Sequence, residues 1–164
     1  MNIWTIDTEA SKRKKILALD LGTKTGWAYY NGENIISGWW DLSLQRGDSQ
    51  GMCFLYLESK LDIFLLTRSK PDIVIFERAH HRGGAATQKA IGFATRVLAW
   101  CAQNGIEHTD IHSGTLKKYA TGSGRADKNK MIELAEKKWE DQEIETDDQA
   151  DALWILDWGM EKFK

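Results

Sequence analysis

Proline and cysteine are scarce in this chain of 164 residues. The single proline, Pro71, argues against a proline-rich linker, and the length suits one domain with a substantial core. The two cysteines, Cys53 and Cys101, form no CxxC or Cys/His spacing, so neither a zinc site nor a disulfide framework is expected. We therefore expect one α/β domain at residues 14–164, preceded by a polar extension at residues 1–13.

Long apolar runs are also missing. No stretch approaches the ~20 apolar residues that cross a bilayer, and residues 1–15 lack the apolar core of a signal peptide. The sequence therefore predicts no membrane partner and a cytoplasmic location.

The net charge is only −2, which does not by itself indicate nucleic-acid binding. The distribution is more informative, because residues 78–138 carry 11 Lys and Arg against 5 Asp and Glu, a net charge of +6. Acidic residues gather instead at positions 140–151. This pattern fits a polyanion bound against a metal site, although an ordinary solvated surface can produce it too.

The apolar pattern predicts a mixed sheet. Strands are expected at residues 15–21, 27–30, 34–40, 72–77 and 106–111, and helices at residues 50–67, 86–104, 113–120, 127–139 and 147–163. Asn31-Gly32 is a hairpin signal, so the first three strands should form an antiparallel meander. Helical crossovers should make the first, fourth and fifth strands parallel, with helices on both faces of a five-stranded sheet.

Four carboxylates occupy positions where a carboxylate requires compensation. Asp20 and Glu77 each end an apolar strand, and Asp148 and Asp151 lie three residues apart on one helix face. The first and fourth strands should be parallel neighbours, so their carboxyl ends should meet at the sheet edge where α/β folds bind ligands. Hard oxygen ligands suit Mg²⁺ or Mn²⁺, and two such ions can promote phosphodiester hydrolysis.

Asp20 and Glu77 also have structural interpretations. Asp20 can cap the turn before Gly22, and Glu77 can pair with Arg78 or Arg82. Either arrangement would satisfy the carboxylate without a metal ion.

The acids of the last helix have a structural interpretation as well. Asp147, Asp148 and Asp151 can be first-turn residues that the helix dipole favours. Asp147 also competes with Asp148 as a ligand, because it lies four residues before Asp151 on the same helix.

With this order of elements and acids, the chain resembles the RuvC-like Holliday-junction resolvases of the RNase H-like nuclease superfamily. Residues 16–28 are similar to that family's opening Asp-x-Gly-[Ser/Thr]-x-x-x-Gly segment, and residues 73–77 to its glutamate strand. Residues 115–128 are similar to its Val-Lys … Gly-x-Gly-x-Ala-[Asp/Glu]-Lys segment, and residues 148–153 to its Asp-x-x-Asp-Ala-Leu signature. The four motifs in this order form a specific combination.

The resemblance implies a structure-selective endodeoxyribonuclease that resolves four-way and branched DNA junctions by paired, metal-dependent hydrolysis. It implies that two Mg²⁺ ions, which Mn²⁺ could replace, are held by Asp20, Glu77, Asp148 and Asp151. It makes Lys117 and Lys128 catalytic residues beside the scissile phosphate. The expected DNA-binding residues are Arg78, His80, His81, Arg82, Lys89, Lys117, Lys118, Arg125 and Lys128. It also implies a homodimer whose interface uses residues 86–104, and no nucleotide cofactor.

The chain departs from the family pattern at two positions. Leu21 stands where cellular members commonly have proline, and His80 where an aromatic residue is usual. The extension and compact size are more similar to a bacteriophage-type member, which would act in the cytoplasm of a bacterial host. His108 and His112 flank the fifth strand and are expected to be structural.

Two other functions stay open. A YqgF-type RNA-processing nuclease has similar opening and closing motifs, and a junction-binding protein without catalysis would share the fold. The segment 20–23 also resembles the first phosphate loop of actin-like and sugar-kinase ATPases. Those ATPases need two such lobes to enclose ATP, and this chain has the length of one.

Overall fold

A computed structural model describes residues 12–80 and 83–164, so His81, Arg82 and most of the expected extension lie outside it. The described residues form five strands and five helices. In chain order they are β1 (Ile16–Asp20), β2 (Lys24–Tyr30), β3 (Ile35–Asp41), α1 (Met52–Thr67), β4 (Ile73–Glu77), α2 (Ala85–Asn104), β5 (Glu107–Ile111), α3 (Ser113–Thr121), α4 (Lys128–Lys138) and α5 (Asp147–Lys162).

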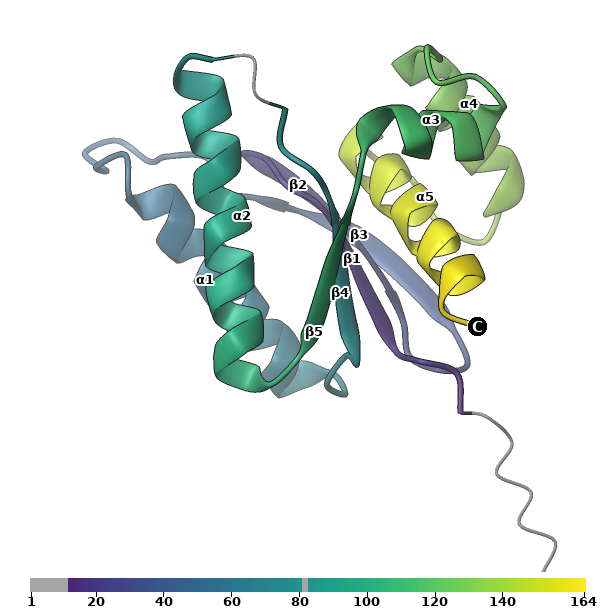
Figure 1. Cartoon of the computed structure of the whole chain (residues 1–164). Helices are drawn as coiled ribbons and strands as arrows, with labels where there is room; N and C mark the ends of the chain where they lie inside the picture. The colour runs from purple at the N-terminus through teal and green to yellow at the C-terminus, as the bar shows by residue number, and fades with distance from the viewer. Residues whose placement is uncertain (1–11, 81–82) are drawn as a thin grey trace, which may run out of the picture.

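The sheet has the strand order β3-β2-β1-β4-β5. β1 pairs antiparallel with β2 and parallel with β4, and β5 continues the parallel half. Helices α1 and α2 lie on one face of the sheet, and α3, α4 and α5 lie on the other (Figure 1). The predicted five-stranded mixed sheet with helices on both faces is confirmed. Across the described chain, no helix combines the length and apolar character needed to cross a membrane.

Alternation along β1 assigns its side chains to two cores. Ile16 and Ala18 are buried against α5, whereas Leu17 and Leu19 are buried among side chains of α1 and α2. Successive residues of a strand point to opposite faces, so a strand covered on both faces must be apolar throughout. This is why β1 and β4 are continuous apolar runs that end only at their carboxylates.

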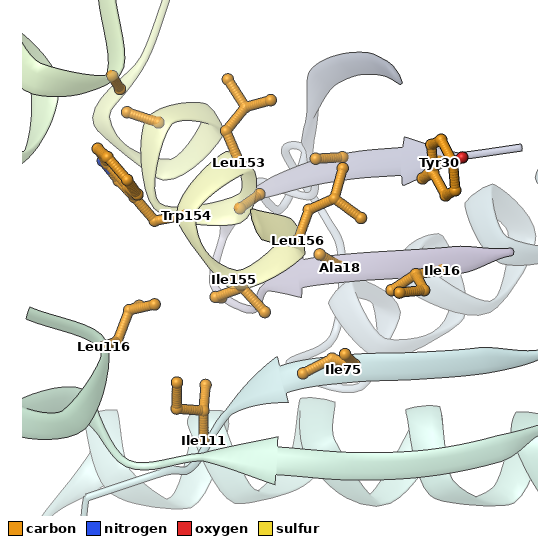
Figure 2. Packing of buried hydrophobic residues seen from close by; sticks show 14 of the residues in the cluster. Ile16, Ala18, Tyr30, Ile75, Ile111, Leu116, Leu153, Trp154, Ile155 and Leu156 are labelled. Atoms are coloured by element: carbon orange, nitrogen blue, oxygen red, sulfur yellow. The ribbon is translucent and has the colours of Figure 1, made fainter. Parts of the chain in front are cut away.

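Helix α5 provides more buried residues to one core than any other element does. Figure 2 shows Ile155 and Leu156 of α5 facing the side chains of β1 and β4, which include Ile16 and Ile75. The first two turns of the helix carry the predicted acids, so this packing also fixes where those acids lie.

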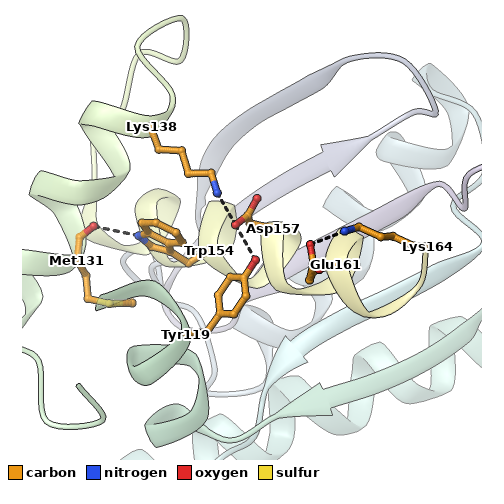
Figure 3. A network of polar contacts seen from close by, with 7 residues as sticks. All are labelled: Tyr119, Met131, Lys138, Trp154, Asp157, Glu161 and Lys164. Atoms are coloured by element: carbon orange, nitrogen blue, oxygen red, sulfur yellow. Dashed lines mark hydrogen bonds and ion pairs between the residues drawn. The ribbon is translucent and has the colours of Figure 1, made fainter. Parts of the chain in front are cut away.

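Polar contacts join α5 to α3 and α4 (Figure 3). The buried indole Nε1 of Trp154 donates to the carbonyl oxygen of Met131 at 3.0 Å. The Asp157 carboxylate accepts from Lys138 Nζ at 2.7 Å and from the Tyr119 hydroxyl at 2.9 Å. Burial and the bond to Asp157 raise the pKa of Tyr119 above its usual range. These contacts hold the basic segments of α3 and α4 against the acidic helix.

Helix α1 offers a matched test of the second core. Leu57 is 0% exposed and Leu66 is 85% exposed on the same helix. Leu57→Ala should lower the free energy of unfolding by about 2–5 kcal/mol because it leaves a cavity. Leu66→Ala should change it by less than about 0.5 kcal/mol. Urea denaturation checks both values, and equal effects would contradict the packing described for α1.

Candidate active site

Asp20 and Glu77 end adjacent parallel strands. β1 and β4 pair in a register that sets Leu19 opposite Phe76, and the next residue on each strand is the carboxylate. Both carboxylates are partly buried at the carboxyl edge of the sheet. The predicted juxtaposition of these two acids is therefore present in the structure.

Among the described residues, neither the turn at Gly22 nor Arg78 takes the structural role expected of it, and the alternative pairing of Glu77 with Arg82 lies outside the described residues. The turn at Gly22 is closed by Thr25, whose Oγ1 donates to the Gly22 carbonyl at 2.7 Å and accepts from the Gly22 amide at 3.3 Å. Arg78 pairs with Asp110 at 2.8 Å and not with Glu77. Neither the turn nor Arg78 therefore accounts for the carboxylates of the cluster.

Gly26 brings the start of α5 to the same edge. The sequence places Gly26 in a turn, but the structure includes it in β2, paired with Asp20. A Cβ atom on this residue would overlap the backbone carbonyl of Asp148. The helix can therefore approach β2 closely only because residue 26 has no side chain.

Gln149 fixes the orientation of the helix start. Its side chain is buried, with 2% exposure, and its Nε2 donates to Ser37 Oγ of β3 at 3.0 Å. Its Oε1 accepts from the Glu145 amide at 2.9 Å. The N-cap residue Thr146 accepts from the Gln149 amide at 3.1 Å. Sequence reasoning missed this residue, although a glutamine between Asp148 and Asp151 in an apolar helix is itself a signal.

The pKa values of Asp20 and Asp151 indicate that the four acids interact. Burial raises the pKa of Asp20 well above its usual range, and the charges of Asp151, Glu77 and Asp148 raise it further. A hydrogen bond between the Asp20 and Asp148 carboxyl groups also favours the protonated form of Asp20. Burial, followed by the charge of Glu77, raises the pKa of Asp151 to about 7. The cluster therefore retains protons at a pH where isolated carboxyl groups have lost them.

Asp147 and Asp148 have different surroundings. The Asp147 carboxylate lies 2.8 Å from Lys128 Nζ, and this contact lowers its pKa below the usual range. Burial raises the pKa of Asp148, whose carboxyl group interacts with Asp20. Of the two competitors, Asp148 interacts with Asp20 and Asp147 binds the lysine, while the charges of both raise the pKa of Asp151.

His80 lies beside Glu77, and His112 lies against His80. Nε2 of His80 lies 3.7 Å from Glu77 Oε1, and the His80 ring meets the His112 ring edge to face, with centroids 5.5 Å apart. His112 caps α3 by accepting from the Gly114 amide at 3.1 Å. The structural role expected for His112 is present, whereas its contact with His80 was not predicted from the sequence.

The other predicted DNA-binding residues lie on α2, α3 and the loop before α4. Within the part of the chain that the structure describes, no carboxylate pairs with their side chains; they are Lys89, Lys117, Lys118 and Arg125. Cations without a carboxylate partner can contact an external anion without first losing an ion pair.

The donor chemistry of the cluster suits a hard divalent cation. Among residues 12–80 and 83–164, no three His, Cys, Asp or Glu side chains are already grouped as the ligands of one ion. The carboxylates are nevertheless close enough to repel one another, and a proton or a cation can relieve this repulsion. Oxygen-only donors are the set that Mg²⁺ prefers.

Comparison with known proteins supports the fold. No protein-family model matches the sequence, and no curated protein matches it either. Among solved structures, RuvC of Thermus thermophilus is 15% identical, with 86% of this chain and 90% of that chain covered and a TM-score of 0.64. The same protein in complex with a Holliday junction substrate is 16% identical, with 92% and 93% covered and a TM-score of 0.69.

A viral structure is similar as well. The Fowlpox virus resolvase, in complex with substrate Holliday junction DNA, is 16% identical, with 90% of this chain and 99% of that chain covered and a TM-score of 0.55. The described sheet and helices thus form the RNase H-like fold of the RuvC-like resolvases, and the resemblance is confirmed at the level of fold.

Gly26→Ala tests the close approach of α5. The added methyl group should displace Asp148 from Asp20 and lower the free energy of unfolding by about 1–3 kcal/mol. Gly51→Ala is a matched control, because Gly51 has φ −71° and open space around it. Denaturation should detect the difference, and Mg²⁺ should raise the melting temperature less in Gly26→Ala than in the parent. Equal stabilities of the two variants would contradict the proximity of Gly26 and Asp148.

The raised pKa values predict how stability depends on pH without divalent cations. Because the folded state holds protons on Asp20 and Asp151 more strongly than the unfolded chain does, stability should fall as pH rises from about 4 through about 7. Asp151→Asn should reduce this fall by roughly 2–4 kcal/mol. Mg²⁺ should stabilise the parent more at pH 8 than at pH 5.5, where protons compete with it. Thermal unfolding measures all three effects, and a pH-independent stability of the metal-free protein would contradict the repulsion.

Proposed function

We propose that this chain is a structure-selective endodeoxyribonuclease that resolves four-way and branched DNA junctions by paired, metal-dependent phosphodiester hydrolysis. The observation that carries this proposal is the convergence of Asp20, Glu77, Asp148 and Asp151 at the carboxyl edge of a RuvC-like sheet. Two of the similar structures are complexes with Holliday junction DNA as the substrate, which supports the same class of substrate here.

In this proposal the four carboxylates of each active site hold two Mg²⁺ ions. Mn²⁺ would be able to replace Mg²⁺. When bound, such a pair activates a water molecule and stabilises the leaving oxygen. The protein's contribution is to set the oxygen donors on two rigid strands and one capped helix. Because the buried carboxylates repel one another, the site favours cation binding once the pH exceeds about 7, where Asp151 has lost its proton.

Lys128 and Lys117 provide positive charge in this scheme. Lys128 is held by Asp147 at 2.8 Å, beside the acids and exposed to solvent. An exposed ion pair of this kind is weak, so an incoming phosphate can replace Asp147 as the partner of the ammonium group. Lys117 lies on α3, which Figure 1 shows next to α5, and would offset charge that develops on the phosphate.

The remaining contacts to DNA would come from the loop after β4 and from basic residues around the site. The proposed residues are Arg78, His80, His81, Arg82, Lys89, Lys118 and Arg125. Arg78 would have to exchange Asp110 for a phosphate, whereas Lys89, Lys118 and Arg125 have no carboxylate partner among the described residues.

We further propose that two copies act together, so that opposed strands of a junction are nicked symmetrically. Ile91 and Leu98 lie seven residues apart on α2 and are 40% and 37% exposed. They line a hollow with Phe76 and Ala79 beside the edge strand β5. An apolar helix face of this kind supports the predicted use of α2 in a dimer interface.

The expected site of action is the cytoplasm, which would be the bacterial host's if a phage encodes the chain.

Junction cleavage tests the proposal. With Mg²⁺, the protein should cut a synthetic four-way DNA junction in symmetric pairs and prefer it to linear duplex. Asp20→Asn should reduce the rate by at least about 100-fold, because it removes a metal ligand at the centre of the cluster. Junction binding should persist, because the substitution removes negative charge that repels phosphates. Gel assays of cleavage and binding with the same junction measure both properties.

Asp148→Asn and Asp147→Asn form a matched pair for the same assay. The first should reduce cleavage as strongly as Asp20→Asn does, and the second should reduce it much less, because Asp147 contacts Lys128 and not Asp20. Full activity of Asp20→Asn would refute the metal assignment. Preference for RNA would favour a YqgF-type nuclease, and junction binding without any cleavage would favour a non-catalytic protein.

A further inference from the structure

The opposite end of the sheet carries a second basic feature. The chain enters β1 through Lys14 and Lys15, which are tied to the starts of the neighbouring parallel strands. The Lys15 amide donates to Asp72 Oδ2 at 2.7 Å, and the Asp72 amide donates to the Lys15 carbonyl at 2.8 Å. Lys14 Nζ lies 2.8 Å from Glu107 Oε2 at the start of β5. The basic run is therefore fixed across the amino ends of β1, β4 and β5.

These residues surround an open hollow of about 500 Å³, which we name the basal lysine hollow. Its lining residues are Lys12, Lys14, Lys15, Lys70, Pro71, Asp72, Gly105 and Glu107. Four lysines and two carboxylates give it a net charge of +2. Glu107 is paired with Lys14, and Asp72 accepts from a backbone amide. In the described chain no carboxylate pairs with the ammonium groups of Lys12, Lys15 and Lys70.

The lining restricts the class of ligand. Among the described lining residues, Pro71 is the one sizeable apolar side chain, so these residues offer no apolar anchor for a lipid surface. The described lining also contains no aromatic ring on which a base or nucleoside could stack. Lysine ammonium groups on flexible stems suit closely spaced charges of no fixed orientation. The backbone of duplex DNA presents such charges, with one phosphate per about 1.7 Å of helix axis.

We propose that the basal lysine hollow is a second phosphate-binding surface for duplex DNA, remote from the acidic cluster. Asp20 lies five residues after Lys15 along β1, or about 16 Å away at about 3.3 Å per residue. This separation is about twice the Debye length of about 8 Å at physiological salt, so the two ends act independently. The inference goes beyond the proposed function and holds whether or not the acidic cluster cuts DNA. The surface would bind the phosphates of a duplex arm, or of a second duplex, away from the cleavage site.

The experiment uses the full chain and a linear duplex, with EDTA present so that cleavage plays no part. Lys12→Ala/Lys70→Ala removes two exposed charges from the hollow, and Lys60→Ala/Lys137→Ala removes two exposed charges from α1 and α4. The slope of log affinity against log salt concentration should become shallower by about 1.8 in the first variant, at about 0.9 per lost phosphate contact. The control variant should keep the parent slope.

Lysine acetylation followed by mass spectrometry gives an independent measurement on the unsubstituted protein. Duplex DNA should slow acetylation of Lys12, Lys15 and Lys70 several-fold and leave Lys60 unchanged. Equal salt slopes in the two double variants, or unchanged acetylation at all three lysines, would overturn the inference. Protection by vesicles containing phosphatidylserine but not by duplex would overturn it in favour of a membrane surface. Failure of junction cleavage would leave these readouts unaffected, so the two proposals fail separately.

Discussion

Like-charge repulsion at the carboxyl edge of the sheet is the constraint on which the rest of the structure depends. Asp20 is surrounded by three other carboxyl groups, and burial removes much of the water that would screen them. Such a cluster is unfavourable for folding unless protons or cations compensate it, so the remainder of the chain must hold it together. Burial and this repulsion are the causes of the raised pKa values of Asp20 and Asp151.

Three features of the fold keep the acids together despite their repulsion. The apolar face of α5 packs on β1 and β4, and at about 25 cal/mol per Å² its buried area stabilises the helix position strongly. Gly26 removes the one side chain that would separate the helix start from β2, and Gln149 ties that start to β3. Packing therefore carries the acids of α5 to Asp20, and the charges themselves contribute nothing favourable until a cation binds.

Much of this arrangement could be predicted from the sequence. Continuous apolar runs that end in Asp20 and Glu77 predict parallel neighbours, and parallel neighbours bring their last residues together. The place of Gly26 within β2 could not be predicted, because its reason is a contact with Asp148, more than a hundred residues later. The pairing of Arg78 with Asp110 and of Lys128 with Asp147 depends in the same way on tertiary geometry. The sequence shows which residues are charged, but only the fold determines which charged residues form ion pairs.

The central claim is that the four carboxylates jointly hold divalent cations. Crystals of the protein soaked in Mn²⁺ test it most directly, through anomalous scattering from the metal. The account predicts anomalous peaks between Asp20, Glu77, Asp148 and Asp151, and their loss in crystals of Asp20→Asn. Well-diffracting crystals with no peak at this edge of the sheet, or with Mn²⁺ bound only elsewhere on the molecule, would contradict it.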